Sequence, residues 1–234
     1  MGYTWDMTSA PHLIAEDLLL LLLDDETGKM AASTYEKSVL GGALLAELGL
    51  VRAVEVEKGA GVFGRQAVVV TADTAPSDPL LASALETVAE KPRSPGDLVD
   101  RLGKGLKARL TDRLVERGLL ERRDGKVLGL FPTTTWPARD SAHEDAVRRQ
   151  LQAALGGGVD PDERTATLVA LLHAVDVVPK VLAVEGMRRG ELKKRAKEIA
   201  DGDWAAKAVK DAVAATTAAM TAAIAAGGAA ASSS

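Results

Sequence analysis

The sequence predicts a mainly α-helical single domain, in which a central helical bundle is wrapped by amphipathic helices and two short β-hairpins. Residues 13–29 read LIAEDLLLLLLDDETGK, and the six leucines at 18–23 are apolar on every side of a helix, so protein or lipid must cover them. The run is shorter than the roughly 20 apolar residues that cross a bilayer, and Glu16 and Asp17 stand directly before it. These residues therefore predict the buried central helix of a globular fold.

A short repeat is the second observation behind this fold. ALLAELGLVRAVE at 43–55 resembles DRLVERGLLERRD at 112–124, and each copy reads as an amphipathic helix, a glycine stop and the start of a hairpin. That order is the outline of a winged-helix half, although two copies are too few for a solenoid. The repeat thus predicts one hairpin after each of two helices.

Helix caps and strand alternation define the elements of the first part. Residues 1–10 are polar and are expected to form a flexible N-terminus. Ser33 and Glu36 have the spacing of a capping box, and Gly49 is placed to end the helix that they begin. Valine alternates with glutamate at 54–57, as in a half-buried strand. The expected elements are a helix at 13–23, a helix at 33–48, strands at 52–57 and 66–71, and a glycine-rich loop at 58–64.

Proline, glycine and aspartate mark the elements that follow. Asp78 before Pro79 is an N-cap with a favoured first helical residue, and Ser94-Pro95-Gly96-Asp97 opens a second, shorter helix. Gly103-Lys104-Gly105 interrupts the helical pattern, and Asp124-Gly125 is expected to be the tight turn of the second hairpin. The expected elements are helices at 79–90, 95–102 and 106–117, the last ended by Gly118, and a hairpin at 119–130.

The rest of the chain is predicted to be helical. Helices are expected at 141–155, at 163–175, after Pro179 and at 203–226, and the last of these is rich in alanine, the best helix former. GGAAASSS at 227–234 is expected to be a disordered tail. The predicted domain therefore spans residues 11–226.

Composition and charge exclude several classes of protein. The net charge of −4 and the pI of about 5.5 argue against a dedicated nucleic-acid binder, because such domains have a pI above roughly 9. No cysteine is present, so the chain has neither a disulfide framework nor a thiolate metal site. The first 15 residues lack the basic region of a signal peptide, and we expect a cytoplasmic protein.

The sequence holds no recognisable catalytic or metal-binding motif. HExxH, GxSxG, Walker A and GxGxxG strings are all absent, so we predict neither enzyme activity nor a cofactor. Among the three histidines, His173 lies at helical spacing from Asp176, and we interpret it as a core histidine hydrogen-bonded to that carboxylate. Asp24-Asp25-Glu26 lacks the spacing of a calcium loop and reads as a solvated turn.

One basic region suggests an anion site. Between residues 101 and 126 the chain has nine Lys or Arg and four Asp or Glu, and Arg101, Lys104 and Lys107 surround the start of a predicted helix. A helix N-terminus presents free backbone N–H groups and the positive end of the helix dipole, which suits a phosphate. The alternative is a solvated helix face beside a flexible turn.

The tip of the first hairpin is the second candidate. Gly59-Ala60-Gly61-Val62-Phe63-Gly64 places Val62 and Phe63 on a loop that either exposes them or folds them back onto the core. If they are exposed, they can enter a lipid interface or a groove of a partner. An apolar anchor and a basic patch together give reversible membrane binding, whereas either alone is marginal.

Several of these segments resemble the Golgi phosphoprotein 3 family of phosphoinositide-binding adaptors, in a bacterial member. The resemblance rests on LIAEDLLLLLLDDETGK followed by LGGALLAELGLV, on LTDRLVERGLLERRDGKVLGLFPTTTWP, and on DPDERTATLVALLHAVDVV, and it covers about residues 11–226. It implies one mostly helical domain, a shallow surface pocket for phosphatidylinositol 4-phosphate, and a hydrophobic hairpin that touches the membrane or mediates self-association.

The same resemblance assigns residues to the pocket. Two basic positions of the family pocket fall on Lys104 and Lys107, its tryptophan falls on Ala32, and a further arginine falls on Gly41. The last two are departures, which remove a stacking surface and one charge. The hydrophobic hairpin corresponds to residues 52–71.

The sequence therefore predicts a non-catalytic, peripherally membrane-associated adaptor. We expect it to bind anionic phospholipid or phosphoinositide headgroups through Lys104 and Lys107, with support from Arg101 and an apolar anchor at Val62 and Phe63. One alternative is a winged-helix-like DNA-binding regulator that would use the basic residues at 107–117. The other is a protein-interaction scaffold that forms homo-oligomers through the hairpin at 52–71.

Overall fold

Helix α1 (Ile14–Leu22) lies in the interior of the computed structural model, and all nine of its residues are buried. The structure describes residues 11–24, 30–31, 33–59, 66–71, 76–127, 131–202 and 207–231. Protein covers the leucine run on every side, as its all-round apolar character requires. The predicted central helix is confirmed.

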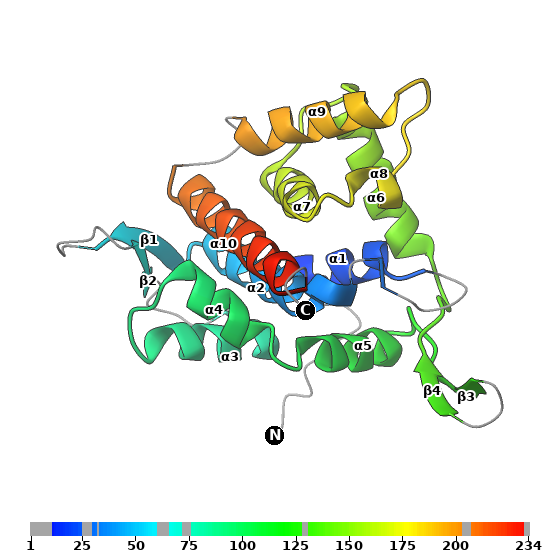
Figure 1. Ribbon diagram of the computed structural model, residues 1–234, viewed down its shortest axis with the longest axis horizontal. Coiled ribbons are helices and arrows are strands. Elements are labelled where there is room, and N and C mark those ends of the chain that lie inside the picture. The colour runs from blue at the N-terminus through cyan, green and yellow to red at the C-terminus, as the bar shows by residue number, and fades with distance from the viewer. Residues whose placement is uncertain are drawn as a thin grey trace.

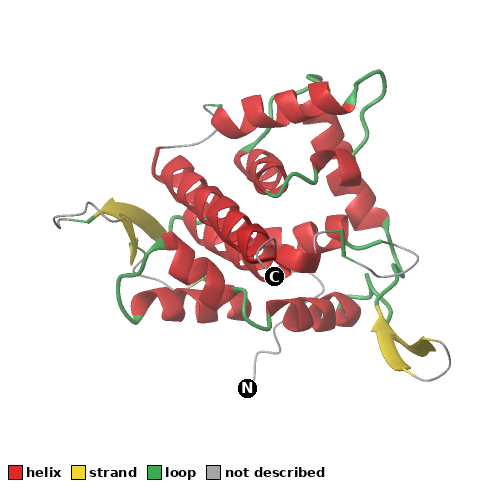
Figure 2. Ribbon diagram, viewed as in Figure 1, coloured by secondary structure: helices red, strands yellow, loops and turns green. Residues whose placement is uncertain are grey.

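Helices make up most of the described chain, and two antiparallel strand pairs accompany them (Figure 2), so the predicted fold class is confirmed. The elements after α1 are η1 (Ser33–Tyr35), α2 (Glu36–Leu50), β1 (Val54–Lys58), β2 (Gln66–Val70), α3 (Pro79–Ala89), α4 (Pro95–Leu102), α5 (Leu106–Glu116), β3 (Arg123–Val127), β4 (Phe131–Thr135), α6 (Ala142–Leu155), α7 (Glu163–Ala174), α8 (Val178–Val181), α9 (Arg189–Asp201) and α10 (Lys207–Ala231).

Helix α2 is the second core helix, and it packs against α1, α4 and α10 (Figure 1). Glycines on the side that faces α10 allow a close approach. A Cβ on Gly42 would lie 2.3 Å from the Sδ of Met220, and one on Gly49 would lie 2.7 Å from the Cβ of Ala212. Because interiors are close-packed, a larger residue at position 49 would push α10 away from α2, and one at position 42 would force the side chain of Met220 to move.

Side-chain caps begin several helices where local sequence predicts them. Asp78 accepts hydrogen bonds from the N–H groups of Leu80 and Leu81, Ser94 accepts one from Asp97, and Asp162 starts α7 in the same way. The capping box expected at Ser33 is wrong, because residues 33–35 form a 3₁₀ turn and α2 begins after Tyr35 without a side-chain cap.

Two helix ends also differ from the sequence prediction. Helix α2 continues through Gly49 to Leu50, and α10 continues to Ala231, beyond the expected end at 226. Residues 232–234 and the N-terminal residues 1–10 lie outside the described residues.

The repeated helix-to-hairpin segments share one backbone cap. Arg52, two residues after the end of α2, lies in the left-handed region (φ 56°), and Gly118, two residues after the end of α5, does the same (φ 76°). In both, the next N–H donates to a carbonyl five residues back, from Ala53 to Leu48 and from Leu119 to Leu114, each at 2.9 Å. This is a Schellman cap. The equivalent cap residues are thus Arg52 and Gly118, so Gly49 is not the stop of its helix.

The second hairpin has a different register from the predicted one. Asp124 and Gly125 lie within β3 and pair with Thr134 and Thr133 of β4, so the connection falls at 128–130, outside the described residues. The β-branched threonines favour a strand, and the hydroxyl of Thr134 donates to the carboxylate of Asp124 at 2.7 Å. The expected Asp124-Gly125 turn is therefore wrong.

Two acidic residues of α1 are buried and hold cations from other helices. Glu16 is 0% exposed. Its carboxylate lies 3.2 Å from Nε of Arg113 in α5 and 3.0 Å from Nη1 of Arg117, the residue directly after α5. Arg113 also contacts Asp78, the cap of α3, at 2.7 Å. A buried charge is tolerated only when it is paired and hydrogen-bonded, so Glu16 fixes α5 and the start of α3 against α1.

Asp17 makes the corresponding contacts on the other side of α1. Its carboxylate lies 2.6 Å from Nη2 of Arg164 and 2.7 Å from Nε2 of His143. Burial raises the pKa of Asp17, but the hydrogen bond to His143 and the charge of Arg164 outweigh this effect and lower it overall. Arg164 also reaches Glu47 of α2 at 3.3 Å. Asp17 therefore joins α1 to α6 and α7.

A Glu16→Gln substitution tests this account of the core. Removing the charge leaves Arg113 and Arg117 without their shared carboxylate, and we expect the free energy of unfolding to fall by about 3 kcal/mol. The measurement is equilibrium unfolding in urea. The matched control is Glu198→Gln, because Glu198 pairs with Lys194 and Arg195 on the surface of α9 and should change stability by less than about 0.5 kcal/mol. Equal effects of the two substitutions would contradict the account.

Candidate anion-binding site

The junction between α4 and α5 contains the predicted basic site. Gly105 adopts a left-handed conformation (φ 67°) that a residue with a side chain rarely adopts, and it lets the chain turn directly from one helix into the next. As the N-cap of α5, Gly105 has no side chain to accept hydrogen bonds from the first turn of the helix. The predicted interruption at Gly103-Lys104-Gly105 is confirmed, and it places Lys104 at the start of α5.

The three predicted cations come from this one junction but have different partners. Lys104 is exposed and has no charged partner in the part of the chain that the structure describes. Lys107 is half-buried, and its Nζ lies 2.9 Å from Oε2 of Glu36. Arg101, in the last turn of α4, pairs with Asp97 at 3.0 Å. The side chain readiest to meet a ligand is therefore that of Lys104.

Two residues near Lys107 were not predicted as part of the site. Glu36, the first residue of α2, forms the ion pair, and the Nζ of Lys107 lies 5.9 Å from the ring centroid of Trp136, which follows β4. That distance is within the range of a cation–π interaction. These residues are separated from Lys107 by 71 and 29 positions along the chain, so no local pattern identifies them.

Two glycines allow the junction between α4 and α5 to pack directly against α2. A Cβ built on Gly41 would lie 2.1 Å from the carbonyl oxygen of Val99 and 2.7 Å from the amide nitrogen of Gly103. A Cβ on Gly103 would in turn lie 1.9 Å from the carbonyl oxygen of Lys37. The backbones of α2 and α4 are therefore in direct contact, and this contact places the first turn of α2 beside the first turn of α5.

The predicted hairpin anchor is described only in part. Strands β1 and β2 pair in antiparallel register from Val54 with Val70 to Lys58 with Gln66, as expected for this hairpin. Val62 and Phe63 lie outside the described residues, and so does Ala32. The apolar anchor at Val62 and Phe63 therefore stays a prediction.

Comparison with known protein families identifies the family of this chain. The family model for Golgi phosphoprotein 3 (GPP34) matches residues 14–216, which is most of the chain. The chain belongs to the Golgi phosphoprotein 3 family. A search of curated proteins gives no match. Golgi phosphoprotein 3 proteins form a non-enzymatic adaptor family, so membership agrees with a chain that is not an enzyme.

This Golgi phosphoprotein 3 family member departs from the family pocket at Gly41 for a structural reason. The resemblance assigns an arginine to this position, but the backbone of α4 occupies the space that even a Cβ would need. The structure therefore leaves no room for the third cation that the resemblance assigns beside Lys104 and Lys107. Carboxylates pair with the other cations at the junction, Lys37 with Asp100, Arg101 with Asp97 and Lys107 with Glu36.

The structure argues against the DNA-binding alternative, because α5 does not present a continuous basic face to solvent. It requires the cations of α5 to face solvent, but Arg113 and Arg117 are turned inward to Glu16, and Lys107 is paired with Glu36. Among these cations Arg109 remains exposed. One free arginine does not supply the run of phosphate contacts that drives non-specific DNA binding.

The remaining sequence candidates do not form a second site. The predicted hydrogen bond between His173 and Asp176 is wrong, because Asp176 leaves the helix with a left-handed backbone (φ 54°) and pairs with Lys193 at 2.7 Å. No group of three or more His, Asp or Glu side chains in the described ranges is arranged to hold a metal ion. Likewise, none of the described helices combines the length and hydropathy needed to cross a bilayer.

A cavity of about 390 Å³ lies beside Asp17, where the chain enters α1. The rings of His12 and His143 stack there with centroids 3.7 Å apart, and Arg164 donates to the carbonyl of His12 at 2.6 Å. Burial and then the neighbouring His143 lower the pKa of His12 to about 4. Burial also raises the pKa of Glu47 to about 7, although Arg164 opposes this. The cavity thus adjoins a polar network that fastens the chain before α1.

Replacing Gly41 by alanine tests the contact between α2 and α4. The new methyl group would collide with the backbone of α4, and we expect the free energy of unfolding to fall by about 1–3 kcal/mol. Gly190→Ala is the matched control, because a Cβ on this helical glycine meets nothing within 4 Å and should stabilise the protein by about 0.5–1 kcal/mol. If both variants were stabilised in urea unfolding, the close contact would not exist.

The pH dependence of stability tests the packing of His12. Because the pKa of His12 is about 4 in the folded chain and 6.5 in the unfolded one, the unfolded chain binds more protons at this residue between those pH values. The contribution of His12 to the free energy of unfolding should therefore rise with pH across that window and be constant above it. Urea unfolding of the parent and a His12→Gln variant, compared at each pH, isolates this contribution. A difference that does not change from pH 4 to 7 would refute the packing.

Proposed function

We propose that this Golgi phosphoprotein 3 family member is a non-catalytic, cytoplasmic adaptor that binds anionic phospholipid headgroups at the junction of α4 and α5. The observation that carries the proposal is the position of Lys104, exposed and without a charged partner among the described residues, at the uncapped start of α5. Lys107 lies one helical turn further along the chain. Backbone N–H groups and ammonium groups in this arrangement favour phosphate.

The proposal concerns anionic headgroups in general. Phosphatidylinositol 4-phosphate is the ligand implied by the family resemblance, but Gly41 and Ala32 replace an arginine and a tryptophan of the family pocket. With these groups absent, charge density should govern binding more than the stereochemistry of a headgroup. A membrane containing phosphatidylserine or phosphatidylinositol 4-phosphate would then be bound in proportion to its charge.

The expected affinity is modest. Each lysine near an anionic membrane contributes about 1 kcal/mol, and immersion of the side chains of Val62 and Phe63 would add roughly 3–6 kcal/mol. A sum of about 6 kcal/mol corresponds to a dissociation constant of tens of micromolar. Binding of this strength is reversible, as an adaptor that leaves and rejoins a membrane requires.

Sedimentation with vesicles tests the proposal. The parent chain should pellet with vesicles of phosphatidylcholine and phosphatidylserine, pellet less as salt rises because exposed charges are screened, and stay in solution with phosphatidylcholine alone. A Lys104→Glu, Lys107→Glu variant should lose the salt-sensitive pelleting. Lys104→Glu alone should weaken the salt-sensitive pelleting. Because Lys104 is exposed, this single variant tests the site without disturbing the half-buried Lys107, whose replacement could also impair folding.

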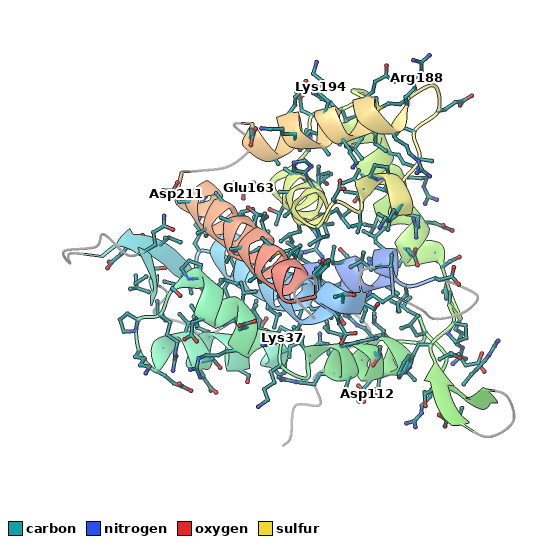
Figure 3. All side chains as sticks on the ribbon, in the orientation of Figure 1. Lys37, Asp112, Glu163, Arg188, Lys194 and Asp211 are labelled. Carbon is teal, nitrogen blue, oxygen red and sulfur yellow. The ribbon has the colours of Figure 1, made fainter. Side chains whose placement is uncertain are left out.

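The matched control reverses two charges on α9. Lys194 and Lys197 are exposed at 80% and 65%, and Lys194 projects from the end of the molecule opposite Asp112 of α5 (Figure 3). Lys194→Glu with Lys197→Glu changes the net charge by the same amount and should leave most of the pelleting intact. The site would be wrongly placed if this control lost binding while the variant at 104 and 107 kept it.

A further inference from the structure

The ammonium group of Lys107 already has an anion beside it. Its Nζ lies 2.9 Å from Oε2 of Glu36 and 5.9 Å from the ring centroid of Trp136, so the three side chains form one cluster. They come from the start of α5, the start of α2 and the segment after β4. The side chains of Lys107 and Glu36 are 24% and 33% exposed, so solvent and ligands still reach the pair.

The fold fixes the position of the residue that carries this carboxylate. Direct backbone contact at Gly41 and Gly103 holds α2 against α4, and Glu36 begins α2 immediately after the 3₁₀ turn. An acidic residue in the first turn also interacts favourably with the dipole of its own helix. The packing of the two helices thus holds the backbone of Glu36 near the start of α5, where its carboxylate reaches Lys107.

We propose that Glu36 is an internal competitor for the anion that Lys107 binds, and this inference rests on the proposed function of the same site. A carboxylate oxygen and a phosphate oxygen accept the same hydrogen bonds from an ammonium group. A phosphate-bearing headgroup must therefore share Lys107 with Glu36 or displace it. When the carboxylate moves away, the ring of Trp136 keeps the ammonium in place through the cation–π interaction. Lys104 makes the first contact, and Lys107 joins after the exchange.

This competition predicts a gain of binding on loss of the carboxylate charge. Glu36→Gln keeps the size and shape of the side chain but removes the competing charge. One unit of charge near an anionic membrane is worth about fivefold in affinity, so the variant should bind phosphatidylserine vesicles at least about fivefold more tightly than the parent. Glu198→Gln on α9 makes the same change in net charge away from the site and should alter binding less than twofold.

A soluble probe separates competition from a general effect of charge. Trp5 and Trp204 are replaced by phenylalanine so that Trp136, the one tryptophan that remains of three, is the fluorescent reporter beside Lys107. The parent and the Glu36→Gln variant are then titrated with inorganic phosphate at constant ionic strength. The fluorescence change should saturate at about fivefold lower phosphate in the variant, and Lys107→Gln should abolish it in both backgrounds.

The two arms distinguish failure of this inference from failure of the proposed function. If neither chain binds vesicles but Glu36→Gln binds phosphate more tightly, the lipid function is wrong and the competition stands. If Glu36→Gln binds phosphate no more tightly than the parent, including no detectable binding by either, the competition is refuted. Tighter binding of vesicles together with unchanged binding of phosphate also refutes it, because general charge then explains the gain.

Discussion

Direct backbone contact between α2 and α4 is the constraint on which the candidate site depends. Neither Gly41 nor Gly103 can carry a Cβ without collision with the backbone of the facing helix. A Cβ on Gly41 would lie 2.1 Å from the carbonyl oxygen of Val99, and one on Gly103 would lie 1.9 Å from that of Lys37. This close approach of the two backbones fixes where α4 ends, and the left-handed Gly105 then fixes where α5 begins. The positions of Lys104 and Lys107, and that of Glu36 at the start of α2, follow from these three glycines. The same contact leaves no room for an arginine at position 41.

The buried acids of α1 determine which cations stay available. Glu16 draws Arg113 and Arg117 inward, and Asp17 does the same with Arg164. A count of charges along the chain makes α5 look like a basic surface, but its inner arginines belong to the core. What remains at the surface is the start of the helix. The charge network therefore stabilises the fold and also confines the candidate site to the junction of α4 and α5.

Features set by neighbouring residues could be predicted from the sequence, and features set by distant residues could not. Asp78, Ser94 and Asp162 cap their helices because each cap involves atoms two or three residues away. The register of the second hairpin depends on how the threonines of β4 pair with β3, so a local Asp124-Gly125 signal was misleading. The partners of Glu16 lie about 100 residues along the chain. The glycines on either side of Lys104 predict its position at the start of a helix. Glu36 and Trp136 come close to Lys107 only through tertiary packing, so the local sequence does not identify them.

Mapping of chemical shifts by NMR tests the central claim most directly. Uniformly ¹⁵N-labelled protein would be titrated with dihexanoyl phosphatidylserine below its micelle concentration, so that the headgroup is presented without a bilayer. The account predicts that the amide signals that shift cluster at residues 101–109 and at the start of α2, and that those of α9 stay unchanged. Shifts confined to α9 or to the cavity beside His12 and His143, with none at the junction of α4 and α5, would contradict it.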